Sequence, residues 1–229
     1  MMSNLPAQAE HPRATATAQG TECNQLAAPV LPPYEMRLLR SYEDLDAVAE
    51  LVTRRTAWLA ARQLPRPYTG DVVTLYREQW VEAVALFEDG HPVGCLRLHR
   101  DPPLSHWDVE ETESSLQLSL AYSAPGAAPD KIGRLMTLWA QDFAARLGMT
   151  WVRCEVSTDN LSSEEALRLL THAKGCGWQF VRFSRDQGGR PLVLLQLPAR
   201  AQLGLHALIR CTVSIHPGMP STPAPGPHR

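Results

Sequence analysis

Residues 116–148, LQLSLAYSAPGAAPDKIGRLMTLWAQDFAARLG, decide the fold of this chain, because a strand pattern passes directly into a helix pattern. Apolar residues alternate at Leu116, Leu118 and Leu120, and this period of two indicates a strand. After a break at Pro125 and Gly126, apolar residues return at the spacing of one helix face. That face consists of Ile132, Leu135, Met136, Trp139, Ala140, Phe143 and Leu147, and Gly148 follows it as the expected residue beyond the helix end.

The junction between this strand and this helix is a candidate anion site. The first turn of a helix has backbone N–H groups without partners in the helix, and the helix dipole places partial positive charge there. A phosphate or diphosphate is a ligand that suits such an end. Many strand-to-helix loops have this geometry and bind nothing, so the junction indicates a site without fixing a function.

The elements around the junction resemble the central motif of the GNAT superfamily of acyl-CoA-dependent N-acyltransferases. In that family, strand four leads through a pyrophosphate loop of the form Arg/Gln-x-x-Gly-x-Gly/Ala into helix three. The matching loop here is residues 128–133, APDKIG, in which Ile132 and Gly133 follow the family pattern. The segments GRLMTLWAQDFAARLG, TWVRCEV and GCGW are similar to helix three, strand five and the Gly-aromatic pair that closes the last helix in small bacterial members. The resemblance covers residues 35–198.

This resemblance implies an α+β fold, the GNAT fold, with a mixed central β-sheet splayed between strands four and five and flanked by helices. It also implies acetyl-CoA as cosubstrate, with the pantetheine in the splay and the diphosphate at the loop. The implied cofactor-binding residues are Ala121, Tyr122, Ser123, Ala128, Pro129, Asp130, Lys131, Ile132, Gly133, Arg134 and Asn160.

Three of these residues have a second interpretation. Lys131 replaces the middle glycine of the loop, and we expect its ammonium to contact a phosphate, although a side chain there also obstructs close approach of the backbone. Arg134 adds a second cation or is simply solvated. Asn160 matches a residue that often binds pantetheine in the family, and it fits a helix-entry turn equally well.

Two residues are candidates for the proton transfers of amide formation, which needs a neutral amine and a protonated leaving thiolate. The family often uses a carboxylate on strand four, but residues 116–122 contain none, so Glu155 on the next strand is the substitute. The family's usual acid is a tyrosine on the last helix, which is also missing, and His172 is the candidate in its place. The competing interpretations are a solvent-facing strand carboxylate and a surface histidine.

Composition and charge argue against several other classes of function. The net charge of −2 provides no footprint for nucleic acid or an anionic membrane, and no apolar run approaches the roughly 20 residues of a membrane span. The five cysteines are odd in number and have no CxxC spacing, so we expect neither a disulfide framework nor a metal site. Without a secretory signal pattern, the sequence is typical of a cytoplasmic protein.

The sequence indicates one domain with a flexible segment at each end. Residues 1–34 and 199–229 have no periodic apolar face, so we expect disorder in the first and a Pro-rich flexible tail in the second, apart from a short turn at 203–210. Gly94 indicates a bulge or a close approach of another backbone. The other expected elements are a strand at 34–39, a helix capped by Ser41, a helix at 71–79, strands 80–88 and 92–99 joined by Asp89-Gly90, a strand at 150–157, a helix through Ala173 with Gly175 beyond its end, and strands 178–183 and 192–197.

Three functions agree with these observations. The first is acetyl-CoA-dependent N-acetyltransfer to the amine of a small molecule or peptide, by a monomer or a homodimer. The second is acyl-CoA binding without turnover, and the third is a cofactor-free interaction module. In this fold the loops at residues 65–70 and 100–115 are expected to set the acceptor, so its identity is not determined by the motif.

Overall fold

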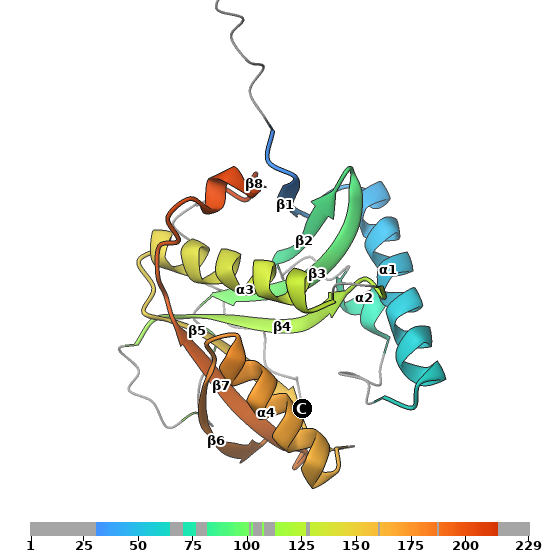
Figure 1. Cartoon of the computed structure of the whole chain (residues 1–229), viewed down its shortest axis with the longest axis vertical. Coiled ribbons are helices and arrows are strands. Elements are labelled where there is room, and N and C mark those ends of the chain that lie inside the picture. The colour runs from blue at the N-terminus through green and yellow to red at the C-terminus, as the bar shows by residue number, and fades with distance from the viewer. Residues whose placement is uncertain are drawn as a thin grey trace, which may run out of the picture. The chain divides into compact units, whose positions relative to one another are not determined.

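The computed structural model contains one mixed sheet. It describes residues 31–64, 71–76, 82–100, 102, 107, 113–126, 129–159, 161–186 and 188–214. The strand order of the sheet among these residues is β6-β7-β5-β4-β3-β2-β1-β8 (Figure 1). The strands are β1 (Tyr34–Leu38), β2 (Glu82–Glu88), β3 (His91–Arg100), β4 (Ser115–Ser123), β5 (Trp151–Ser157), β6 (Gln179–Arg185), β7 (Pro191–Pro198) and β8 (Ile209–Cys211). The helices are α1 (Tyr42–Ala61), α2 (Val72–Tyr76), α3 (Pro129–Arg146), α4 (Ser163–Gly175) and the 3-10 turn η1 (Leu205–Ala207).

Helices cover both faces of this sheet. The period of two in β3 directs Leu96 and Leu98 toward α3, where they pack with Trp139 in one buried cluster. Cys95, which precedes Leu96 and belongs to the alternate set of positions, lies in a second cluster with Val48 of α1. Figure 1 shows α3 crossing the centre of the sheet and α4 lying along the β5–β7 side. The expected fold, a mixed sheet flanked by helices, is confirmed.

The sheet is open between β4 and β5. The two strands pair in parallel only from Ser115 opposite Trp151 to Leu118 opposite Cys154. Beyond that point β4 follows β3, and β5 follows β7. The predicted splay between strands four and five is therefore present, and it begins at residue 119 of β4.

A bulge in β4 marks the start of the splay. Leu120 has a φ of 49°, and the register against β3 shifts there, so that two residues of β4 lie opposite Leu96. A left-handed leucine costs about 1–2 kcal/mol. The hydroxyl of Tyr76 on α2 donates a hydrogen bond to the carbonyl of Leu120, and this buried contact holds the bulge in place. Burial raises the pKa of Tyr76 well above its usual value, so the phenol keeps its proton.

Several local signals in the sequence produce the expected geometry. The Ser41 side chain accepts a hydrogen bond from the backbone of Asp44 at the start of α1. Asp89 and Gly90 have φ values of 49° and 80°, as a tight hairpin turn requires. Gly148, with a φ of 73°, follows α3 as predicted.

Gly94 lies where another element approaches β3 closely, as the sequence indicated. The approaching atoms belong to two side chains of α3 and not to a backbone. A Cβ at this position would lie 2.7 Å from Sδ of Met136 and 2.8 Å from Cγ2 of Ile132. The absence of a side chain on β3 therefore lets the first turns of α3 descend onto the sheet.

Most predicted boundaries differ from the structure by one or two residues, such as those of the strand expected at 178–183, which spans Gln179–Arg185. Gly175 is the last residue of α4 rather than a residue beyond it, and Gly177 takes the left-handed conformation with a φ of 91°. The strand expected from residue 80 begins at Glu82, and residues 77–81 lie outside the described part of the chain.

The prediction of a flexible tail from residue 199 is wrong for residues 199–214. β8 adds to the edge of the sheet in parallel with β1, and Tyr34 pairs with Ile209. Leu205, Ile209 and Val213 are buried in the same cluster as Trp139. Three separated apolar residues anchor this segment, a pattern too sparse to indicate a strand. Residues 1–30 and 215–229, where disorder was expected, lie outside the described residues.

Candidate functional site

A cavity of about 520 Å³ opens where β4 and β5 separate. It is lined from both faces of the sheet. Gly133 and Thr137 of α3 and His172 of α4 contribute from one face, while Ser119 and Glu155 contribute from the two strands. This volume lies in the range of small-molecule and cofactor sites.

Glu155 lies on the β5 side of the opening with its carboxylate held in place. Its Oε1 atom accepts hydrogen bonds from the indole Nε1 of Trp107 and from Nε2 of Gln117, each at 2.9 Å. Trp107 is buried, and the guanidinium of Arg153 lies 5.3 Å from the centroid of its ring. Arg153 is itself fixed by Glu113, whose Oε2 atom is 2.7 Å from its NH2 group. Glu155 is thus an oriented acceptor rather than a solvated strand residue.

Ser119 lies on the β4 side of the opening, at the last position before the bulge. Its Oγ atom is 3.0 Å from Nε2 of His99, which comes from the neighbouring strand β3. In the β4–β5 register, Leu118 pairs with Cys154, so Ser119 and Glu155 occupy the next positions, where pairing has ceased. The two residues therefore face the cavity from opposite edges.

The sequence analysis missed Ser119, His99, Gln117 and Trp107. The alternation of β4 places Gln117 and Ser119 on one face, and this signal was available. The partner from β3 was not predictable, because the long segment 101–114 between the two strands does not fix their register, and a one-residue shift exchanges the faces of a strand.

On the α3 side, the first turns of the helix meet the cavity at Gly133. A Cβ built on Gly133 has no atom within 4 Å, so the space beside it is open. Ile132 is buried against the sheet in the main core. Arg134 is exposed and is not among the residues that line the cavity.

Lys131 turns toward β1. Its ammonium lies 5.2 Å from the centroid of the Tyr34 ring, and a hydrogen bond to Tyr34 raises the pKa of the lysine. Contact with a phosphate, as expected for Lys131, requires a different rotamer from the one observed. Of the other expected loop residues, Pro129 and Asp130 begin α3, while Ala128 lies outside the described residues, as does Asn160.

The end of β4 contributes its expected residues in different ways. Ala121 lines the cavity and is exposed. Tyr122 is buried in the cluster with α1, and Ser123 pairs with Gly94 of β3. Only Ala121 of these three lies directly at the opening.

His172 lies on an exposed turn of α4 and borders the cavity. Its Nε2 atom is 3.8 Å from Sγ of Cys176, one turn further along the helix. The two predicted candidates for proton transfer, Glu155 and His172, are therefore brought to the same cavity from different elements. Their catalytic roles stay predictions.

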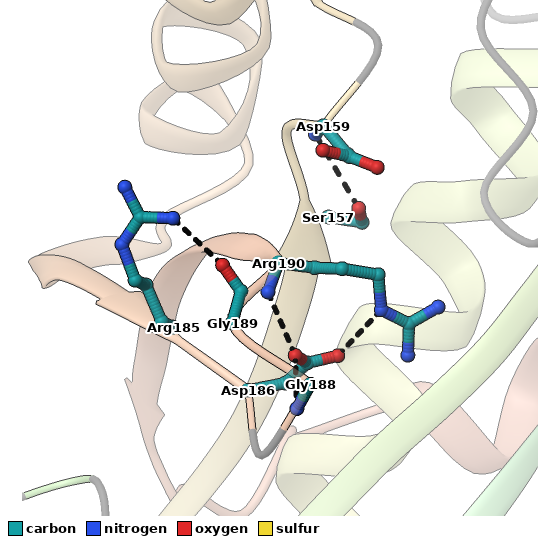
Figure 2. Close-up of polar contacts among 7 residues, drawn as sticks. All are labelled: Ser157, Asp159, Arg185, Asp186, Gly188, Gly189 and Arg190. Carbon is teal, nitrogen blue, oxygen red and sulfur yellow. Dashed lines mark hydrogen bonds and ion pairs between the residues drawn. The ribbon is translucent and has the colours of Figure 1, made fainter.

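The turn between β6 and β7 closes one end of the cavity with an oriented arginine. Asp186 accepts hydrogen bonds from the backbone N–H groups of Gly188 and Arg190, each at 2.9 Å, and from Nε of Arg190 at 2.7 Å. These contacts lower the pKa of Asp186, with the backbone bond from Arg190 as the largest cause. Figure 2 shows that Arg185 and Arg190 leave the turn in opposite directions and that the terminal nitrogens of Arg190 point away from Asp186.

The thiols of Cys154 and Cys95 are not reactive nucleophiles. Burial raises the pKa of Cys154, which lines the cavity, and that of Cys95 to about 12, so both stay protonated near neutral pH. The four cysteines in the described residues are free. Among those residues, no group of three or more His, Cys, Asp or Glu side chains is placed to hold a metal ion. No described helix combines the length and apolar character needed to cross a bilayer.

Comparisons with known proteins identify the fold. No family model matches the sequence, and no curated protein matches it. The structure is similar to a GNAT-family acetyltransferase from Listeria monocytogenes, with a TM-score of 0.55 and 15% identity over 72% of this chain and 94% of that one. It is also similar to an N-acetyltransferase from Staphylococcus aureus, with a TM-score of 0.50 and 9% identity over 72% and 97% of the two chains. The chain has the fold of the GNAT acetyltransferases.

Proposed function

We propose that this protein is an acetyl-CoA-dependent N-acetyltransferase that acts on the amine of a small molecule. One observation carries the proposal: the cavity at the β4–β5 opening reaches from Gly133, in the second turn of α3, to an oriented carboxylate on β5. Such a passage brings together a helix terminus suited to phosphates and a group suited to an amine.

The cofactor is assigned to the α3 side of the cavity. The open space beside Gly133 allows a diphosphate to approach the first turn of α3, where backbone N–H groups and the helix dipole favour negative charge. The pantetheine is assigned to the opening, next to Ala121 and the β4 backbone beyond the bulge, where no β5 partner occupies the hydrogen-bonding groups. Acetyl-CoA bound there supplies the activated thioester.

Glu155 is assigned the role of the base that accepts the proton of the amine. An ionised carboxylate attracts an ammonium and accepts its proton, directly or through one water molecule. Trp107 and Gln117 both donate hydrogen bonds to Oε1 of this carboxylate. Their hydrogen bonds fix the orientation of the carboxylate and thereby reduce the ordering needed in the transition state.

Acyl-CoA binding without turnover is the second candidate. Two observations favour it: β4 carries no carboxylate in residues 115–123, and α4 carries no tyrosine. In this alternative the cavity binds the thioester, and Glu155 has only a structural role beside Trp107.

Two measurements on the full chain separate these functions. Native mass spectrometry after incubation with acetyl-CoA measures binding, and a thiol-release assay with a panel of primary amines measures transfer. We expect binding and CoA release with at least one amine, and mass spectrometry of the product should show one added acetyl group. Binding without release at any pH between 6 and 9.5 establishes the second candidate, and an absence of binding contradicts both.

A further inference from the structure

The two edges of the β4–β5 opening carry different polar groups. On β5, Glu155 accepts hydrogen bonds from Trp107 and Gln117 and, when ionised, has no proton to give. On β4, Ser119 presents a hydroxyl that both accepts and donates, and its Oγ atom is 3.0 Å from Nε2 of His99. The opening thus has a hydrogen-bond acceptor, Glu155, on one edge and the hydroxyl of Ser119, within hydrogen-bond distance of an imidazole, on the other.

Amide formation needs both kinds of group. The amine must lose a proton, and the thiolate that leaves from the thioester must gain one. The other candidate acid, His172, is on an exposed turn of α4, whereas Ser119 lies at the point where the strands separate. A serine hydroxyl by itself is a weak acid, but a hydrogen-bonded imidazolium replaces its proton as it is lost.

We propose that Ser119 is the proton donor to the CoA thiolate and that His99 is the positioning residue that restores its proton. This inference rests on the proposed function and assigns its second proton transfer. The amine nitrogen bonds to the carbonyl carbon, the carbon–sulfur bond breaks, and the amine proton passes to Glu155. The sulfur takes the hydroxyl proton of Ser119 while Oγ takes the Nε2 proton of the His99 imidazolium. Glu155 then releases its proton to water, and the neutral imidazole regains one.

The test compares single and double variants in the full chain. Ser119→Ala and His99→Leu should each lower kcat by about 10²-fold or more, the usual contribution of a positioned acid. The dissociation constant for CoA should stay within about twofold of the wild-type value, since neither side chain is assigned to the cofactor. Because the two residues act as one unit, the double variant should lose no more than the worse single variant.

Two conservative variants and one control complete the experiment. Ser119→Thr retains a hydroxyl and should recover part of the lost kcat. His99→Gln retains an N–H donor but has no proton to transfer, so its kcat should stay close to that of His99→Leu. Ser184→Ala removes a partly buried serine of β6 that is not among the cavity-lining residues, and it should leave kcat unchanged. Circular dichroism and the thermal midpoint establish that each variant is folded.

The outcomes distinguish this inference from the function on which it rests. If the wild type acetylates an amine and Ser119→Ala does so equally well, the inference is overturned and the function stands. Multiplicative losses in the double variant, or a fall in CoA affinity that accounts for the fall in rate, also overturn it. If the wild type transfers no acetyl group, both proposals fail together.

Discussion

The indole N–H of Trp139 lies 3.4 Å from Sγ of Cys211 and donates a hydrogen bond to it, which joins the middle of α3 to the last strand of the sheet. Trp139 is fully buried, and β8 is held beside β1 by the pairing of Tyr34 with Ile209. The segment after β7 therefore helps to hold α3 in position, and α3 in turn lines the candidate site.

We predict that truncation after residue 198 strongly destabilises the protein. It removes the buried side chains of Leu205, Ile209 and Val213, each worth about 1.5–3 kcal/mol of burial, and it exposes Trp139. Since domains are stable by only about 5–15 kcal/mol, the truncated chain should be largely unfolded at 37 °C. Urea unfolding followed by tryptophan fluorescence measures the loss.

The control truncation ends at residue 214 and keeps the contacts that β8 makes with the other described residues. Its urea midpoint should match that of the full chain. Equal midpoints for both truncations are inconsistent with a structural role for residues 199–214.

The second prediction concerns Gly133. Gly133→Glu should abolish CoA binding in isothermal titration calorimetry while the fold survives, because the side chain enters open space and brings negative charge to the assigned diphosphate site. Gly133→Ala is the matched control: it adds one methyl group and no charge, and it should raise stability by up to about 1 kcal/mol through helix propensity. Unchanged CoA affinity in the Glu variant places the cofactor elsewhere.

The third prediction concerns the carboxylate on β5. Glu155→Gln should lower kcat by about 10²–10⁴-fold with little change in CoA affinity, because the amide cannot take a proton. Trp107→Phe removes one hydrogen bond to Glu155 and keeps a ring beneath Arg153, so its effect on kcat should be smaller. His172→Ala tests the exposed alternative in the same assay. A larger loss in His172→Ala than in Glu155→Gln reverses the assignment.

The fourth prediction is a pH effect at the turn between β6 and β7. Folding lowers the pKa of Asp186, so its contribution to stability is present above its unfolded pKa of about 3.9 and is lost as the pH falls through the folded value. Asp186→Asn should therefore destabilise the protein more at pH 7 than at pH 3. Thermal unfolding at pH 7, 4.5 and 3 measures the difference, and a difference that is constant with pH contradicts the assignment.

Local patterns explain how much of this fold was predictable from the sequence. The alternation of β4, the apolar face of α3 and the Asp89-Gly90 turn are contained within short windows, and each was identified. β8 was missed because its three residues, Ile209–Cys211, have no period, and their partner strand begins at Tyr34, near the other end of the chain. Pairing over such a distance is determined by tertiary packing rather than by local propensity.

The candidate site was predictable to a similar extent. Glu155 and His172 were selected by residue type and by family position, and both border the cavity. Lys131 was selected by its position in the loop, but its side chain packs on Tyr34, a contact that depends on how α3 lies over β1. The Ser119–His99 pair depends on the register of β4 against β3, and no sequence period contains that information.

The interrupted ladder between β4 and β5 also has a mechanical consequence. Four residue pairs, from Ser115–Trp151 to Leu118–Cys154, are the whole backbone seam between the two strands. The sheet therefore consists of two parts, one ending at β4 and one at β5, which are joined only by this short paired segment. Helix α3 contacts both strands and so connects the two parts. A molecule bound in the opening contacts both strands at once, so filling it should slow amide hydrogen exchange along the paired segment as far as Ser115 and Trp151, which do not line the cavity.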